Sequence, residues 1–111
     1  GWEAWKTFPH ERQRLIDLVD QSSSETVLFI SGDRHRGGLY QLTTDSQKNI
    51  TEMTSSSLNL AFANDEEDGP LRVGPTFVQE NYGEIILDKS TSKITVNLKD
   101  NQGQIIQSVD L

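Results

Sequence analysis

The chain has 111 residues, contains no cysteine and carries a formal net charge of −7 at pH 7. This length corresponds to a single domain, or a fragment of one, and the absence of cysteine excludes disulfides and thiolate metal sites. The acidic balance argues against binding of a nucleic-acid backbone, which needs a clustered basic surface. No apolar run approaches the roughly 20 residues that span a bilayer, so we expect no membrane span.

The N-terminal part of the chain predicts a helix over about residues 9–20. Pro9 suits the first helical turn, where its missing N–H is not needed, and Glu11 favours the positive end of the helix dipole. An apolar face follows at Leu15, Ile16, Leu18 and Val19. Just before the helix, aromatic residues recur at three-residue spacing, which predicts core positions for Trp2, Trp5 and Phe8.

A short apolar strand is predicted over residues 27–30, and it stops at a serine and a glycine. The loop 31–36 then presents Asp33 and His35 two positions apart. In extended backbone these two side chains would point to the same side, because side chains alternate along a strand. Carboxylate and imidazole are common metal ligands, so Asp33 and His35 are candidate ligands. A glycine followed by an aspartate is also ordinary turn chemistry, and that alternative stays open.

Residues 38–111 predict a β-rich region interrupted by a loop at about 60–75. Period-two alternation and turn residues indicate strands over 38–42, 50–54, 82–87, 94–98 and 104–109, the last three forming an antiparallel meander. The acidic cluster 65–68 predicts a solvated, mobile surface segment. The expected fold class is α/β (α+β), with one N-terminal helix followed by a mostly antiparallel β-sheet.

Short motifs occur in a fixed order along the chain: FPHERQRL at 8–15, SGDRH at 31–35, TSSSL at 54–58, ENYG at 80–83 and IILD at 85–88. As an ordered set they resemble the C-terminal part of alkaline phosphatase D (PhoD-like) enzymes, which are calcineurin-like metallophosphoesterases. The resemblance implies the C-terminal half of an α/β sandwich. It also implies a hydrolase that cleaves phosphomonoesters or phosphodiesters with metal-activated water.

The same resemblance implies that Asp33 and His35 bind the two different metals of one dinuclear site. The wider superfamily has GHxH here, and the aspartate at the first ligand position favours harder cations. Divalent or trivalent ions, with Ca, Fe, Zn or Mn as the choices, are the expected cofactors. No residue is assigned as a general acid. The hydroxyl-rich stretch 54–57 is a candidate for phosphate contact, with ordinary loop chemistry as the alternative. Arg34 and Arg36 are candidates to stabilise a phosphoryl oxygen, with exposure to solvent or pairing with neighbouring acids as the alternative.

The N-terminal metal motifs of that superfamily do not occur upstream of residue 27. We therefore expect the C-terminal portion of a phosphatase, inactive and without bound metal on its own, whose partner is the missing N-terminal half and whose substrate is a phosphate ester. Family resemblance implies a periplasmic or secreted bacterial enzyme.

If the chain is only half of an α/β sandwich, we expect an exposed apolar face or a dimer that hides it, because residues 27–30 are apolar on both faces. The competing class is a non-catalytic β-rich binding or interaction module in which Asp33 and His35 only shape a turn.

Overall fold

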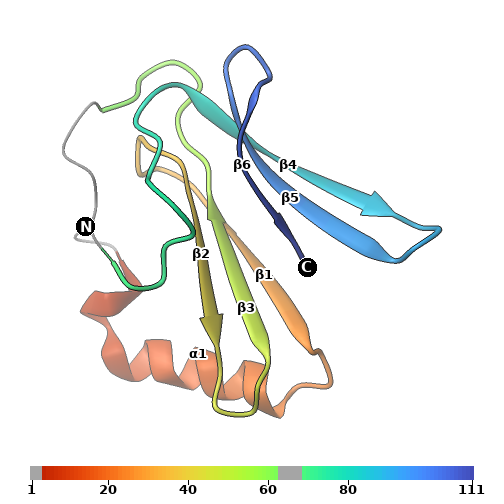
Figure 1. Ribbon diagram of the computed structural model, residues 1–111. Helices are drawn as coiled ribbons and strands as arrows, with labels where there is room; N and C mark the ends of the chain where they lie inside the picture. Colours follow the sequence, from red (N-terminus) through yellow and green to blue (C-terminus); the bar gives the residue numbers. More distant parts are fainter. Residues whose placement is uncertain (1–3, 63–68) are drawn as a thin grey trace.

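The computed structural model describes residues 4–62 and 69–111, so Trp2 and the acidic cluster 65–68 lie outside the described residues. The described chain has a short 3-10 helix η1 (Trp5–Thr7), one α-helix and two three-stranded sheets (Figure 1). This is the predicted α+β class. The strands are β1 (Thr26–Ser31), β2 (Gly38–Thr43), β3 (Asn49–Thr54), β4 (Asn81–Asp88), β5 (Lys93–Asp100) and β6 (Ile105–Asp110).

Helix α1 covers Pro9–Gln21, as its start and apolar pattern predict, but of the predicted apolar face only Val19 is buried and Leu18 is 65% exposed. Its C-terminal end is held against the first sheet, because Lys48 Nζ donates hydrogen bonds to the carbonyls of Val19 and Ser22. A lysine at this position also suits the negative end of the helix dipole. Figure 1 shows α1 running across the end of the sheet where the β2–β3 turn lies.

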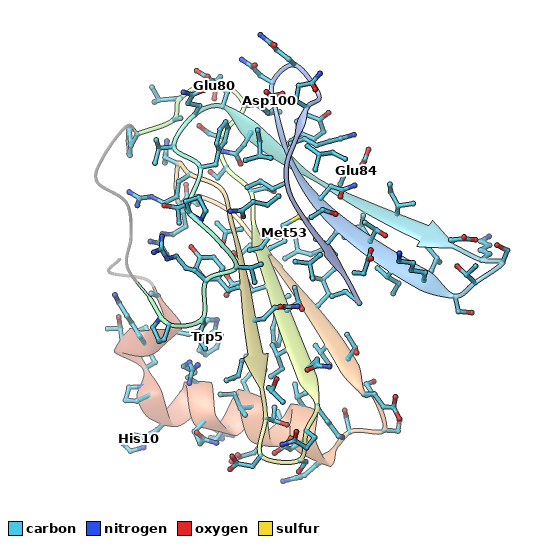
Figure 2. The ribbon with its side chains drawn as sticks, viewed as in Figure 1. Trp5, His10, Met53, Glu80, Glu84 and Asp100 are labelled. Atoms are coloured by element: carbon cyan, nitrogen blue, oxygen red, sulfur yellow. The ribbon has the colours of Figure 1, made fainter. Side chains whose placement is uncertain are left out.

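The expectation that the aromatic stripe is core is wrong for its described members. Trp5 is 53% exposed and Phe8 is 55% exposed. Both precede the helix, whereas the helix is anchored at its other end, where Val19 is buried. Figure 2 shows Trp5 and His10 at the N-terminal end of α1.

The first sheet has the order β1-β3-β2, with β1 parallel and β2 antiparallel to β3. The segment 69–77 covers the outer edge of β2, where Val73 N–H donates to the Leu39 carbonyl and Gly37 exchanges two hydrogen bonds with Phe77. No strand of the described chain covers the outer edge of β1.

The second sheet is the predicted antiparallel meander β4-β5-β6. Its inner face meets the first sheet, and the core between the two sheets is built on Leu39, Met53 and Val96. Met53 lies between the sheets in Figure 2. Partly buried side chains pack around this centre: Leu28, Val73, Ile94, Val109 and Leu111.

Strand β1 is not enclosed by the chain's own side chains. Ile30 is 64% exposed, and Phe29 is only half-buried. Other exposed aliphatic side chains lie on β4, at Ile85, Ile86 and Leu87. Within the described ranges, α1 is too short and too polar to cross a membrane.

Candidate functional site

Two loops meet at one edge of the first sheet. Because β1 and β3 are parallel, their carboxyl ends lie together, and Ser31 is the register partner of Thr54. The two hydroxyls are hydrogen-bonded at 2.8 Å, and the N–H of Ser55 donates to the carbonyl of Ser31 at 3.1 Å. The loop that follows β1 and the hydroxyl-rich stretch that follows β3 are therefore side by side.

A carboxylate that the sequence patterns did not single out lies just beneath these loops. Glu52 Oε1 accepts a hydrogen bond from the Ser31 hydroxyl at 2.7 Å and lies 3.2 Å from the Thr54 hydroxyl, whose single proton is shared between Ser31 and Glu52. Its signal in the sequence is an acidic residue inside an otherwise buried strand, since Thr51 and Met53 are both buried. Glu52 joins the ends of the two parallel strands through their hydroxyls.

The loop after β1 is not extended, so the period-two argument for Asp33 and His35 does not apply. Both residues have left-handed backbone, with φ of 58° at Asp33 and 53° at His35. Asp and His tolerate this region better than most residues. The conformation turns the chain back toward β2, and Asp33 is exposed while His35 is half-buried.

His35 is held from several sides. Its N–H donates to Ser56 Oγ at 3.2 Å, and its carbonyl accepts the N–H of Phe62 at 3.0 Å. Its ring stacks on the Phe62 ring with centroids 4.1 Å apart and an interplanar angle of 8°. Ring Nδ1 contacts the carbonyl of Leu60.

The Leu60 contact decides which ring nitrogen is available to a ligand. A carbonyl oxygen only accepts, so Nδ1 must carry the proton, and the neutral ring keeps its lone pair on Nε2. Metal-binding histidines commonly have this arrangement, with one ring N–H donated to a backbone carbonyl and the other nitrogen on the metal.

The hydroxyls of the stretch 54–57 mainly build the loop. Thr54 bonds Ser31 and Glu52, Ser56 accepts from His35, and Ser57 Oγ accepts the N–H of Leu60 at 3.0 Å. Ordinary loop chemistry, one of the two readings of this stretch, therefore accounts for the contacts seen. Arg34 and Arg36 flank His35 and are half-buried.

The ligand set in the described chain is incomplete for a metal centre. No three side chains of histidine, cysteine, aspartate or glutamate come together within residues 4–62 and 69–111. Metal centres of the catalytic zinc type use three protein ligands. No third side chain of these types therefore joins Asp33 or His35 within the described ranges.

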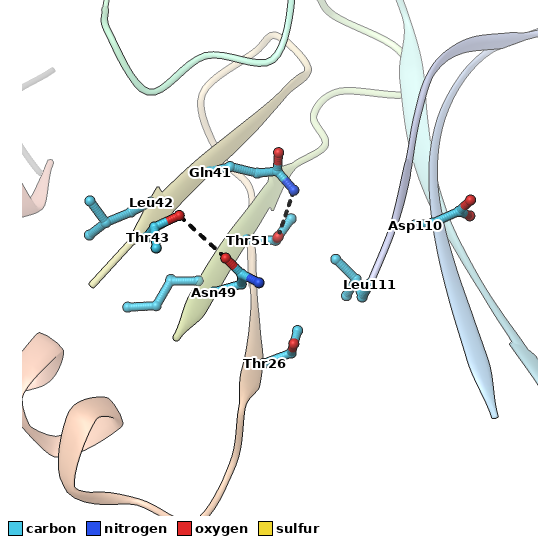
Figure 3. Close-up of a pocket in the computed structure, with 9 residues that line it drawn as sticks. Thr26, Gln41, Leu42, Thr43, Asn49, Thr51, Asp110 and Leu111 are labelled. Carbon is cyan, nitrogen blue, oxygen red and sulfur yellow. Dashed lines mark hydrogen bonds between the residues drawn. The ribbon is translucent and has the colours of Figure 1, made fainter. Parts of the chain in front are cut away.

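A hollow of about 170 Å³ lies far from this edge, near the starts of β1 and β3, where Thr26 pairs with Asn49 (Figure 3). Its wall holds the hydrogen bond of Gln41 Nε2 to Thr51 Oγ1. Its one carboxylate, Asp110, is paired with Lys93 at 2.8 Å. The hollow has no ligand chemistry comparable to that of the His35 loop.

A second polar cluster occupies the outer face of the β4-β5-β6 sheet. Lys99 Nζ contacts Glu84 Oε1 at 2.8 Å, and Asn97 Nδ2 donates to Glu84 Oε2 at 3.0 Å. These bonds, the Lys99 bond first, lower the pKa of Glu84, and the same contact raises the pKa of Lys99. The groups satisfy one another, so the cluster stabilises the meander.

Comparison of the chain with protein-family models, with curated proteins and with solved structures gave no match.

Proposed function

We propose that this chain is the C-terminal portion of a metal-dependent phosphoesterase resembling the PhoD-like enzymes, in which Asp33 and His35 bind metal. The observation that supports this most is the state of the His35 ring. Its Nδ1 is committed to the Leu60 carbonyl, which leaves Nε2 as the free lone pair of an oriented imidazole. The loop lies at the carboxyl end of a parallel strand pair, the edge where open α/β sheets bind their ligands.

In the complete enzyme, bound metal ions would lower the pKa of a water molecule and neutralise charge on the phosphoryl oxygens. The residues of this chain contribute ligands and their orientation. His35 offers Nε2 from a ring fixed by Leu60 and Phe62, and Asp33 offers an exposed carboxylate two residues away. A phosphomonoester or phosphodiester is the proposed substrate, and a periplasmic or secreted location follows from the resemblance alone.

The open edge of β1 supports a partner that completes the sheet. Strand β1 lacks a second neighbour among the described strands, it contains no charged residue, and Ile30 is 64% exposed. An uncharged edge strand is a template for further pairing. The proposed partner is the N-terminal half of the phosphoesterase, which would also bring the missing metal ligands to the same edge.

A specific observation also favours the second candidate, a non-catalytic binding or interaction module. The left-handed conformations of Asp33 and His35 and the stack of His35 on Phe62 are sufficient reasons for these residues to be present in a turn. In that case neither side chain would have a ligand.

Titration of the 111-residue chain with Mn²⁺, followed by NMR, separates the two candidates. The phosphoesterase proposal expects weak binding, with paramagnetic broadening centred on Asp33 and His35, and no hydrolysis of an aryl phosphate above background. His10, which is exposed on α1, is the internal control. Broadening spread over the other acidic residues, with none at this loop, would favour the binding module.

The complete enzyme gives the decisive comparison. His35→Ala should reduce metal content and phosphatase rate together, whereas His10→Ala should change neither. Unchanged metal content in His35→Ala would remove His35 from the site, and fast turnover by the 111-residue chain alone would contradict the view that it holds only part of a centre.

A further inference from the structure

One polar side chain behind the His35 loop is almost completely buried. Asn81, the first residue of β4, is 1% exposed, and its side-chain amide makes three hydrogen bonds. Its Oδ1 accepts the N–H of Ser56 at 2.8 Å. Its Nδ2 donates to the carbonyl of Ser56 at 2.6 Å and to that of Gln79 at 2.7 Å. The side-chain amide of Asn81 is thus hydrogen-bonded to both the N–H and the carbonyl of the Ser56 main chain.

The hydrogen bonds of Asn81 to Ser56 connect it indirectly to His35. Ser56 Oγ accepts the main-chain N–H of His35 at 3.2 Å, so the sequence of contacts runs from Asn81 through Ser56 to His35. The main chain adds a parallel connection, since the N–H of Asn81 donates to the carbonyl of Ser57 at 3.1 Å. The second sheet is in this way joined to the two loops at the carboxyl edge of the first.

Asn81 also contacts the far end of the His35 loop. A Cβ atom added to Gly37 would lie 2.8 Å from Asn81 Oδ1 and 2.7 Å from a methyl carbon of Leu98. There is no room for a side chain at Gly37, because the Leu98 side chain and Asn81 Oδ1 occupy the space that it would need. The Asn81 amide therefore lies beside Gly37, two residues after His35. It also holds Ser56, whose hydroxyl accepts the main-chain N–H of His35.

We propose that Asn81 is a positioning residue for His35: it fixes the Ser56 peptide, and through Ser56 it sets the orientation in which the His35 ring presents Nε2. The proposal rests on the proposed metal-binding role of His35. Only an amide meets the requirement at this position, because it supplies one acceptor and two donors in a plane. Aspartate would lack the donors, and leucine would leave the Ser56 peptide unsatisfied in the interior.

The chain offers a matched control for a buried asparagine that has only a structural role. Asn97 is 2% exposed, and its side chain donates to Glu84 and accepts from Ser108 Oγ at 2.7 Å. These partners lie on β4 and β6, within the β4-β5-β6 sheet. Asn81→Ala and Asn97→Ala each remove a buried amide, so a general loss of stability affects both.

The first readout needs no metal and no catalysis. In long-range ¹H–¹⁵N spectra at alkaline pH, where the imidazole is neutral, the wild-type chain should show His35 protonated at Nδ1. Asn81→Ala and Ser56→Ala should each shift the ring toward a mixture of tautomers, because the loop no longer holds Nδ1 against the Leu60 carbonyl. Asn97→Ala should keep the wild-type signature. Ser56→Ala removes the bond through which Asn81 is proposed to act on His35, so an unchanged His35 spectrum in this variant overturns the proposal even if Asn81→Ala does not fold.

The second readout is the affinity for Zn²⁺ alone. Loss of an outer residue that orients a ligand weakens metal binding by about 10-fold to 100-fold, and we expect a weakening of about 10-fold in Asn81→Ala and in Ser56→Ala, with no change in Asn97→Ala. The proposal is overturned if the folded Asn81→Ala and Ser56→Ala chains keep the wild-type His35 spectrum, or if Asn97→Ala changes it equally. Failure of the wild-type chain to bind any metal would instead count against the proposed function, while the tautomer comparison would still test Asn81.

Discussion

Replacement of Gly37 by alanine tests the packing on which the candidate site depends. The new methyl group would meet three atoms of Leu98 and Asn81 at 2.7 to 2.9 Å, well inside the 3.4 Å at which ordinary contact begins. Neither neighbour has room to retreat, because Leu98 is 0% exposed and Asn81 is 1% exposed. Overpacking of a well-filled interior costs about 1 to 3 kcal/mol, and three simultaneous overlaps with buried atoms place this substitution near 2 kcal/mol or above.

Urea denaturation of Gly37→Ala and Gly69→Ala measures this cost directly. Gly69 is the matched control, since no atom of the described residues lies within 4 Å of its added Cβ. Both substitutions restrict the unfolded chain in the same way, so the difference between them isolates the overlap. We expect Gly69→Ala within about 0.5 kcal/mol of wild type and Gly37→Ala about 2 kcal/mol less stable, with Tm lower by roughly 8 °C. Equal stability of the two variants would refute the close packing of the loop on Asn81.

Two further substitutions test the open edge and the acid response. Ile30→Lys places a charge on the uncharged edge strand, so any self-association of the wild-type chain seen by sedimentation velocity should disappear. Self-association that persists unchanged in Ile30→Lys would contradict self-pairing through β1. The hydroxyl and N–H of Ser90 lower the pKa of Asp88 from 3.8 to about 2, so its stabilising contribution is complete above pH 3.8 and is lost as the pH falls toward about 2. Asp88→Asn should therefore show a shallower loss of stability over that interval in acid titrations followed by circular dichroism, and an unchanged slope would show that Asp88 does not contribute.

Local patterns were sufficient for the elements whose partners are close in sequence. Pro9 at the start and an apolar face predict α1, and α1 covers Pro9–Gln21. The alternation over 82–87 and 94–98 predicts a hairpin, and β4 and β5 pair in register from Asn81 with Asp100 to Asp88 with Lys93. In both cases the stabilising contacts lie within a few residues, or across one turn, so the periodicity of apolar residues in the sequence is sufficient to predict them.

The arrangement of the first sheet depends on contacts between distant segments, which the periodicity of apolar residues does not reveal. The parallel pairing of β1 with β3 passes over β2, and nothing in the separate strands specifies it. The aromatic stripe failed for a related reason: spacing identifies one face of a helix, but burial needs a partner for that face, and Phe8 is 55% exposed.

The candidate site was partly predictable. The spacing of Asp33 and His35 identified the loop but gave it the wrong backbone, since an extended chain was assumed where φ is positive at both residues. Asn81 carried no signal as a positioning residue, because a lone asparagine before an alternating strand is ordinary turn chemistry. Its importance comes from Ser56 and Gly37, which are 25 and 44 residues away in sequence.

The contacts around His35 bear on how a metal would bind. The loop is held by contacts within the chain: the His35 N–H donates to Ser56 Oγ, the Phe62 N–H donates to the His35 carbonyl, and His35 Nδ1 contacts the Leu60 carbonyl. Under the proposed function the His35 ring is therefore oriented by the chain's own contacts, and metal binding need not supply the energy that orders this residue, unlike in small domains that fold only with metal. The affinity would then be limited by the number of ligands rather than by their disorder. Metal content should accordingly rise when further ligands are brought to the edge of β1, and stabilisation of the isolated chain by added metal should remain small.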